Sequence, residues 1–367
     1  MIRLRKGAVV EVVRARPGAL ELVVAVEGED DCPAVAYPAL VGPVRPGDTV
    51  LLNTTAVALA LGTGGTHFVV AVEGSEPPWK GGPHGGRTMK LRYTPLQLQV
   101  QAAEEEGSPY RASLQRTEGL DGTPVVWVPL HSMVGPAVAG ARAAGASRVA
   151  YVMTDGAALP SMFSRLAADL RRTGLLDAVI TAAQAFGGDL EAVNTFTALL
   201  AARVVAGAEV IVVGDGPGNT GTDTLWGATD IESAMALNAA GILGGRPVAA
   251  LRISFADPRR RHRVVSHHSL TALGRVVLMA VHVAVPAIED ETRRAAVWEA
   301  LRAAGMQERH QVVEVNGRPA LDLLANSGIR PSSMGRGSDD DPEFFLAAGA
   351  AGVLAGRMAA GERAWKG

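Results

Sequence analysis

The chain has 367 residues, of which 48 % are hydrophobic and 20 % are charged, a composition that can bury a large core and predicts a globular protein of two domains. Its 35 basic and 37 acidic side chains give a formal net charge of −2, which excludes a global electrostatic field for nucleic acid or an anionic membrane. The single cysteine, Cys32, excludes an internal disulfide framework and a cysteine-rich zinc site.

The N-terminal segment MIRLRKGAVVEVVRARPG is basic but has no long apolar run, so it is not predicted to be a signal peptide. The longest apolar run, residues 276–288, contains His282 and Pro286 and is shorter than the roughly 20 residues that a spanning helix needs. We therefore expect a cytoplasmic protein with no nucleic-acid and no membrane partner. A homo-oligomer is compatible with the sequence, which carries no signal for its stoichiometry.

Residues 1–73 predict a compact all-β domain, either a barrel or a sandwich. Five short valine-rich runs predict five or six strands, and turn signals at residues 17–18, 46–48 and 62–65 separate them. Residues 74–121 are expected to be a linker with a connecting strand and helix. The segment GSEPPWKGGPHGG indicates a surface loop, MKLRY favours a strand, and Pro95 followed by LQLQVQAAEEE favours a helix.

Residues 122–367 alternate apolar runs with alanine-rich segments, a pattern that predicts a doubly wound, Rossmann-like α/β domain with a mostly parallel sheet. Thr229 with Glu232 predicts a capping box, and Asp341 before Pro342 predicts the start of the last helix. The predicted strands are Val125–Pro129, Arg148–Met153, Ala178–Ala182, Glu209–Val213, Pro247–Ile253, Arg275–Val285 and Gln311–Val315.

Polar loops follow five successive predicted strands, whereas the opposite sheet edge has ordinary glycine-terminated helix exits. Ligands of open parallel sheets bind outside the carboxyl ends of the strands, so these loops predict a functional site there. Two of the loops contain Asp155 and Asp189. These aspartates would be paired catalytic carboxylates or metal ligands, with helix capping as the structural alternative.

The segment AEVIVVGDGPGNTGT, residues 208–222, places a glycine cluster directly after a strand. We call residues 214–222 the glycine loop; its backbone N–H groups would approach a bound anion closely. The pattern GPGNTG matches a dinucleotide fingerprint, but the helix begins late, at Thr229, and no acid ends the next strand. A dinucleotide, another phosphate or carboxylate, and a purely structural turn all stay open. The predicted ligand-binding residues are Gly214, Gly216, Gly218, Asn219, Thr220, Gly221 and Thr222.

The segment DPRRRHRVVSHH, residues 257–268, is the densest polar cluster of the chain. Asp257 and its three histidines are ligand types for zinc or another divalent metal, although their spacing is not a known signature. Alternatively its arginines clamp an anion while a histidine moves a proton, or the loop is exposed and caps a helix. We expect His267 and His268, with Asp155 and Asp189, to be catalytic, and Arg259 and His262 to bind the ligand.

The chain lacks the sequence signals of P-loop NTPases, zincins, standard α/β-hydrolases and thiol oxidoreductases. The neighbours His131 and Ser132 do not constitute a nucleophile and base pair, because adjacency in sequence does not create that geometry. Serine chemistry is therefore unsupported.

Several blocks occur together along the chain: RPGDTVLLNTTAVALALGTGG, MKLRYTPLQ, MTDGAALP, GGDLEAVN, GPGNTGT, RISFADPRRRHRVVSHHSLT and SSMGRG. In combination they resemble a bacterial family of unknown function, domain of unknown function 3866, over nearly the whole chain. The resemblance implies no activity and transfers no catalytic or binding residue.

The sequence thus predicts a protein that binds a small anionic, phosphorylated ligand at the carboxyl edge of a parallel sheet, with or without histidine acid/base catalysis. It identifies no cofactor. Two alternatives stay open: a metal-dependent hydrolase that uses the aspartate and histidine loops, and a non-catalytic ligand sensor or assembly module.

Overall fold

The structure is a computed structural model that describes residues 2–61, 65–75 and 86–362. The chain divides into two compact units, Met1–Val100 and Gln101–Gly367. The predicted linker, residues 74–121, spans this division. Part of that linker, residues 76–85, and most of the turn predicted at residues 62–65 lie outside the described residues.

The first unit contains a closed five-stranded barrel with the strand order β1-β2-β3-β5-β4, which confirms the predicted small β domain. Alternate residues of each strand point inward, and Val24, Val50 and Leu52 are fully buried in the barrel core. One strand pair, β3 with β5, is parallel, and the other recorded pairs of the barrel are antiparallel. The elements are β1 Leu4–Arg16, β2 Ala19–Val26, β3 Cys32–Ala36, α1 Pro38–Val41, β4 Thr49–Asn53, α2 Thr55–Ala58 and β5 His67–Val72.

The connecting segment differs from its prediction. The predicted strand is present as β6, Thr88–Lys90, but the expected helix after Pro95 is wrong. Leu98–Val100 forms strand β7, which pairs with β6 in antiparallel register. The segment LQLQV alternates apolar and polar residues, as a strand does. Its pairing with β6 outweighs the preference of Pro95 for the first turn of a helix. A short helix, α3 Arg111–Gln115, follows in the second unit.

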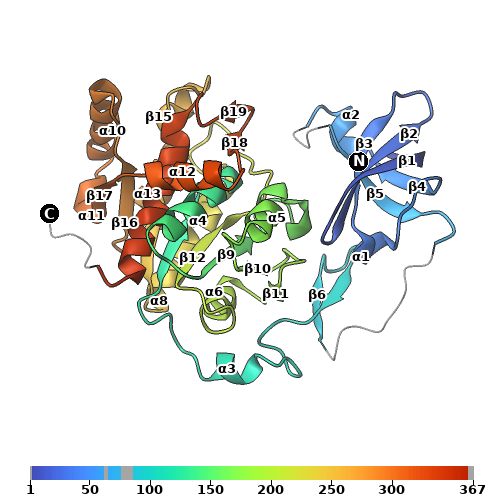
Figure 1. The fold of residues 1–367 in the computed structure, drawn as a ribbon, viewed down its shortest axis with the longest axis horizontal. Helices are drawn as coiled ribbons and strands as arrows, with labels where there is room; N and C mark the ends of the chain where they lie inside the picture. The colour runs from blue at the N-terminus through green and yellow to red at the C-terminus, as the bar shows by residue number, and fades with distance from the viewer. Residues whose placement is uncertain (1, 62–64, 76–85, 363–367) are drawn as a thin grey trace. The chain divides into compact units, whose positions relative to one another are not determined.

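The second unit is built on an eight-stranded sheet with the order β11-β10-β9-β12-β8-β13-β16-β17, in which every recorded pairing is parallel (Figure 1). This confirms the predicted α/β class. Its strands are β8 Pro124–Trp127, β9 Val149–Thr154, β10 Ala178–Thr181, β11 Leu190–Glu191, β12 Val210–Asp215, β13 Arg246–Ala250, β16 His282–Pro286 and β17 Gln311–Val315.

Helices cover both faces of this sheet and bury two separate apolar cores. Because both faces of the sheet are buried, its strands consist almost entirely of apolar residues. One face carries α4 Val134–Ala143, α5 Arg165–Arg172, α12 Arg318–Asn326 and α13 Pro342–Ala359. The other carries α6 Thr195–Val204, α8 Met235–Ile242, the π-helix η5 Ala272–Val276 and α10 Glu291–Ala303.

Helices α4 and α13 approach so closely that their backbones touch through glycines. A Cβ atom built on Gly140 would lie 2.3 Å from the carbonyl oxygen of Gly349, and one built on Gly352 would lie 2.0 Å from that of Ala137. The alanine and glycine pattern of α13 therefore serves packing against α4 and across the central strands. In the described parts of the chain, no helix has the length and apolar character needed to cross a bilayer.

Three local predictions change on inspection of the structure. The strand expected at Arg275–Val285 begins only at His282, because Arg275 and Val276 end η5 and residues 277–281 belong to no helix or strand. The capping box at Thr229 is absent: Ala228 is the N-cap of α7 Thr229–Ser233, and the Thr229 hydroxyl accepts a hydrogen bond from Asn219 instead. Asp341 does precede α13, but its carboxylate binds other segments rather than the helix N-terminus.

Candidate functional site

A cleft of about 380 Å³ lies at the carboxyl edge of the sheet in the second unit. Its lining comes from the loops after β8, β12 and β13, together with the hairpin of β18 Ser332–Ser333 and β19 Arg336–Gly337. In the sheet, β8 lies between β12 and β13, so the chain changes direction here. Crevices at such switch points are the usual ligand sites of open parallel sheets.

The glycine loop divides into a packed part and a cleft-lining part. Gly214 and Gly216 do not line the cleft, and a Cβ atom on either would lie 2.7 Å from a backbone carbonyl oxygen, of Val128 or Ala158 respectively. Thr222 also lies outside the cleft and binds the carbonyl oxygen of Gly227. The cleft-lining part consists of Pro217, Gly218, Asn219, Thr220 and Gly221.

Asn219 is held in place by the end of β12. Its side-chain amide donates to the Asp215 carboxylate at 3.0 Å and to the Thr229 hydroxyl at 3.2 Å. The same carboxylate accepts hydrogen bonds from the Thr154 hydroxyl at 2.6 Å and from the Gly156 N–H at 3.2 Å. Asp215 therefore connects the loops after β9 and β12 and positions the cleft wall.

Asp215 is 2 % exposed, and this burial raises the pKa of its carboxyl group to about 6. The hydrogen bonds from Thr154 and Gly156 lower that pKa, whereas the charges of Asp155 and Glu232 raise it further. The charge of Asp215 in turn raises the pKa of Asp230, which lines the cleft.

The raised pKa of Asp215 predicts a loss of stability as the pH rises. The unfolded chain releases this proton near its ordinary pKa of 3.8 while the folded protein keeps it until about pH 6, so folding becomes less favourable between those values. Asp215→Asn should abolish this fall. Its free energy of unfolding, relative to the unchanged protein, should rise by roughly 3 kcal/mol between pH 4 and pH 7 in urea titrations.

A matched control for this prediction is Asp339→Asn, because Asp339 is exposed. The free energy of unfolding of this control should equal that of the unchanged protein at every pH. If Asp215→Asn also matches the unchanged protein, the carboxyl group of Asp215 is already ionised at pH 4 and the assigned burial effect is wrong.

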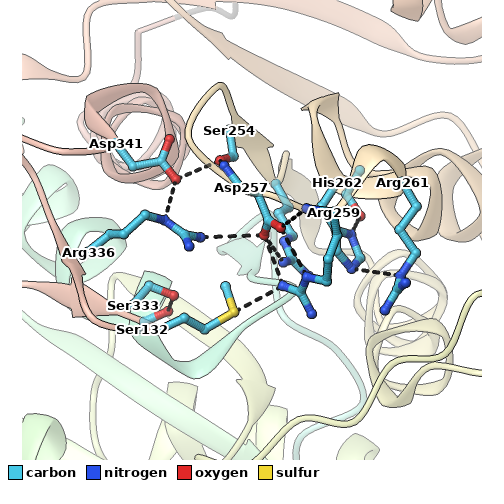
Figure 2. Close-up of polar contacts among 12 residues, drawn as sticks. Ser132, Ser254, Asp257, Arg259, Arg261, His262, Ser333, Arg336 and Asp341 are labelled. Atoms are coloured by element: carbon cyan, nitrogen blue, oxygen red, sulfur yellow. Dashed lines mark hydrogen bonds and ion pairs between the residues drawn. The ribbon is translucent and has the colours of Figure 1, made fainter.

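An arginine and aspartate cluster forms a second wall of the site (Figure 2). The fully buried Asp257 carboxylate lies 3.0 Å from Arg252, 2.9 Å from Arg259 and 3.4 Å from Arg336. Arg259 engages both carboxylate oxygens, in a fork that favours planar anions. We call Asp257 and these three arginines the arginine hub.

The arginine hub connects two distant segments of the chain, residues 252–259 and residues 336–341. Arg336 also binds Asp341 at 3.3 Å, and the Ser254 hydroxyl donates to Asp341 at 2.6 Å (Figure 2). Burial would raise the pKa of Asp257, but hydrogen bonds and charge from Arg259, with the charge of Arg252, hold it well below its ordinary value. The three guanidinium groups make ion pairs with two carboxylates, Asp257 and Asp341, and the charge of Asp230 also acts on Arg252.

Two buried polar atoms beside the cleft have no partner among the described residues. These are Nε of Arg252 and Oδ2 of Asp230, whose side chains both line the cleft. Burial lowers the pKa of Arg252 to about 10, so the guanidinium group stays charged at neutral pH. Burial also raises the pKa of Asp230 to about 6, against the opposing charge of Arg252.

Three histidines meet at the cleft, as the metal interpretation of the sequence required. His262 ends the 3-10 turn η4 Arg260–His262, and His267 and His268 begin α9 His267–Thr271. One nitrogen from each ring lies within 4.8 Å of the others. The ring centroids of His267 and His268 are 3.9 Å apart. We call these residues the histidine cluster.

The environment of the histidine cluster keeps all three imidazoles neutral at pH 7. Burial, followed by the charges of nearby arginines, lowers the pKa of His262 to about 3. Burial and the neighbouring His267 lower the pKa of His268 to about 4, and burial with Arg261 lowers that of His267. Neutral imidazole is the form that binds a metal ion.

The structure places the two other predicted catalytic residues away from the cleft. Asp155 accepts a hydrogen bond from the Gln184 N–H and lines a separate cavity of about 420 Å³. Asp189 accepts the Val179 N–H and pairs with Arg171 on the surface. Neither joins the histidine cluster. Neither caps a helix, because Ser164 and Asn194 cap α5 and α6.

The loop after β8 contributes packing rather than a nucleophile. His131 contacts the hydroxyls of Tyr151 at 3.3 Å and Ser164 at 2.7 Å, and burial lowers its pKa to about 4. The adjacent Ser132 hydroxyl donates to Ser333 at 3.0 Å and so fastens the β18–β19 hairpin (Figure 2). The expected lack of a serine and histidine pair between His131 and Ser132 agrees with these contacts.

Sequence reasoning assigned no role to Asp215 or Asp230, and it offered Asp257 only as a candidate metal ligand. Asp215 lies inside the glycine loop, but only its contacts with Thr154 and Gly156 reveal the buried carboxyl group. Arg336 lies 79 residues from Asp257, so nothing in the local pattern pairs them. The density of arginines after Asp257 was the available signal for an ion-pair hub rather than a metal ligand.

Comparison with known families agrees with the resemblance seen in the sequence. The family model "Protein of unknown function (DUF3866)" matches residues 33–352. The chain belongs to the DUF3866 family. This match includes the glycine loop, the arginine hub, the histidine cluster and the barrel strands β3 (from Pro33) to β5, whereas β1 and β2 lie before residue 33. No curated protein matches the DUF3866 chain.

Proposed function

We propose that this DUF3866 protein is a cytoplasmic protein that binds a small anion, a phosphate ester or a carboxylate, in the cleft at the switch point of its sheet. The observation that carries the proposal is the arginine hub. Arg252 and Arg259 line the cleft, and within the described residues the three guanidinium groups make ion pairs with only two carboxylates, Asp257 and Asp341. Arginine forks bind carboxylate and phosphate oxygens with matching geometry.

The glycine loop supports the same ligand class from the opposite wall. Gly218 has a φ of 99° and borders open space, which allows the backbone to approach a ligand. Within the described residues, the N–H groups of Gly218, Asn219 and Thr220 donate no hydrogen bond to the protein. Backbone N–H groups in such a loop are suitable donors for anionic oxygens.

The experiment that tests this proposal measures the binding of inorganic phosphate and pyrophosphate to the chelator-treated full chain. We expect binding detectable by calorimetry and a thermal shift that grows with ligand concentration. Arg259→Gln should weaken binding about 10-fold or more, because a charge-assisted hydrogen bond contributes about 1.5–3 kcal/mol. Arg259→Lys should restore only part of the affinity, since it keeps the charge and loses the fork.

Arg263→Gln is the matched control, because Arg263 is an exposed arginine of the same loop that does not line the cleft. It should bind both probes like the unchanged protein. If Arg259→Gln and Arg263→Gln lost the same affinity for the probes, overall surface charge would explain the binding, and the proposed site would be overturned. Absence of binding by either probe to the unchanged protein would overturn the phosphate form of the proposal, and acetate and citrate then test the carboxylate form.

A further inference from the structure

The histidine cluster has the internal organisation of a ligand set. His262 Nδ1 lies 2.9 Å from the Ser266 hydroxyl, and His268 Nε2 donates to the Thr224 carbonyl oxygen at 3.3 Å. Each of these rings is therefore oriented through one nitrogen, and the second nitrogen of His262 accepts a hydrogen bond from Arg261. In metal sites, a ligating histidine is likewise oriented by a hydrogen bond to the nitrogen that does not bind the metal.

His267 supplies the observation that ordinary packing does not explain. Its Nε2 atom is buried and has no hydrogen-bond partner among the described residues. Leaving a buried polar atom unpaired destabilises the folded protein. The ring nevertheless lies against His268 and 5.8 Å from His262, centroid to centroid, where a shared ion would satisfy it.

From this geometry we propose that His262, His267 and His268 together bind one divalent transition-metal ion, with Zn²⁺ as the natural candidate. Three imidazoles suit zinc, copper, nickel and iron, and calcium and magnesium prefer oxygen ligands. Nitrogens bound to one zinc ion at about 2.0–2.1 Å lie roughly 3.4 Å from each other. The ring nitrogens of the histidine cluster lie within 4.8 Å of one another, so the rings would move together by roughly an ångström to bind one ion.

One neighbour competes with the metal for its ligand atom. The Arg261 Nε–H donates to His262 Nε2 at 3.2 Å, and Arg261 lies 3.5 Å from the 83 % exposed Asp223. The guanidinium group would leave His262 when an ion enters and keep its contact with Asp223 at the surface. Removing Arg261 should therefore tighten metal binding rather than weaken it.

The proposed ion would lie beside the anion cleft, because His262 and His268 both line it. A zinc ion with three protein ligands keeps a position for water or for an oxygen of a bound anion. The site thus favours the metal-dependent hydrolase over the non-catalytic ligand sensor. In this role the histidines bind the metal ion and do not act as acid/base catalysts. The metal assignment does not depend on the anion proposal, since it rests on the histidine cluster alone.

The test uses the purified full chain after removal of bound metal with a chelator. Co²⁺ is titrated and followed by its visible absorption, which reports four-coordinate nitrogen ligation, and Zn²⁺ is then added as a competitor. We expect one Co²⁺ per chain, displaced by Zn²⁺. His267→Ala and His268→Gln should each weaken Co²⁺ binding at least 10-fold, while Arg261→Gln should bind Co²⁺ at least as tightly as the unchanged protein.

His282→Ala is the control histidine variant, because His282 lies at the start of β16 and outside the histidine cluster. Circular dichroism confirms that each variant is folded before titration. No Co²⁺ band in the unchanged protein, or equal affinity in His267→Ala and His282→Ala, would overturn the assignment. Phosphate binding that persists in chelator while Co²⁺ binding fails would overturn the metal site alone, and the reverse would overturn only the anion site.

Discussion

Asp257→Asn is expected to lower the free energy of unfolding of the second unit by about 3–5 kcal/mol at pH 7. The substitution keeps the shape of the side chain but leaves Arg252, Arg259 and Arg336 without their shared negative charge. Asp257 is fully buried and Arg252 nearly so, so water does not replace the lost interaction. Urea titration followed by tryptophan fluorescence measures the change, since Trp127 is buried in this unit.

The pH dependence of this effect has a defined sign. The pKa of Asp257 is lower in the folded protein than in the unfolded chain, so its stabilisation is complete above the ordinary carboxyl pKa and is lost as the pH falls below it. The difference between the unchanged protein and Asp257→Asn should therefore be largest above pH 5 and shrink towards pH 3.

Asp322→Asn is the matched control for Asp257, because Asp322 pairs with Arg318 on the surface and is 58 % exposed. A surface pair of this kind contributes less than about 1 kcal/mol. If Asp257→Asn and Asp322→Asn lowered the free energy of unfolding by the same amount, the arginine hub would have no special role in stability.

Gly140→Ala is expected to destabilise the same unit by about 2–3 kcal/mol, although alanine is the better helix former by about 1 kcal/mol. The added methyl group would lie 2.3 Å from the Gly349 oxygen and 2.9 Å from the Val353 nitrogen, and both atoms belong to the backbone of α13. Helices α4 and α13 would have to separate. Urea unfolding of the purified variant measures the cost.

Gly135→Ala provides the comparison within the same helix. Its new methyl group would meet only the Leu166 side chain, at 3.1 Å, and that side chain can rotate. This variant should be neutral or slightly more stable, because it gains helix propensity without a backbone clash. If Gly140→Ala and Gly135→Ala lowered the free energy of unfolding by similar amounts, α4 and α13 would not pack through Gly140.

The sequence was sufficient to predict the fold class because its signals are local. Valine-rich runs and alanine-rich segments report strands and helices within a few residues of themselves, and Gln311–Val315 was predicted with its observed bounds. The two-residue strand β11 is too short to leave such a pattern. The apolar stretch before His282 was misassigned because Arg275 and Val276 end η5 and residues 277–281 lie outside any helix or strand, which apolar composition alone does not reveal.

The candidate site was only partly predictable, because strand order decides which loops meet. Five polar loops at the carboxyl edge were visible in the sequence, but β9 and β10 lie on the far side of β12 from β8. Asp155 and Asp189 follow those outer strands and therefore stay apart from the histidine cluster. The capping role expected of Thr229 failed for a related reason, since Asn219 of the glycine loop recruits its hydroxyl.

The contact of α13 with β8 and α4 has a consequence for the synthesis of this protein. Helix α13 starts at Pro342 and covers strands that the ribosome produces more than 200 residues earlier. Until residue 359 has left the exit tunnel, the face of α4 that carries Gly140 stays uncovered. The barrel lacks such a dependence, because its five strands lie within residues 4–72. The nascent chain can therefore complete its barrel early, whereas part of one apolar face of the sheet in the second unit stays uncovered until α13 is made.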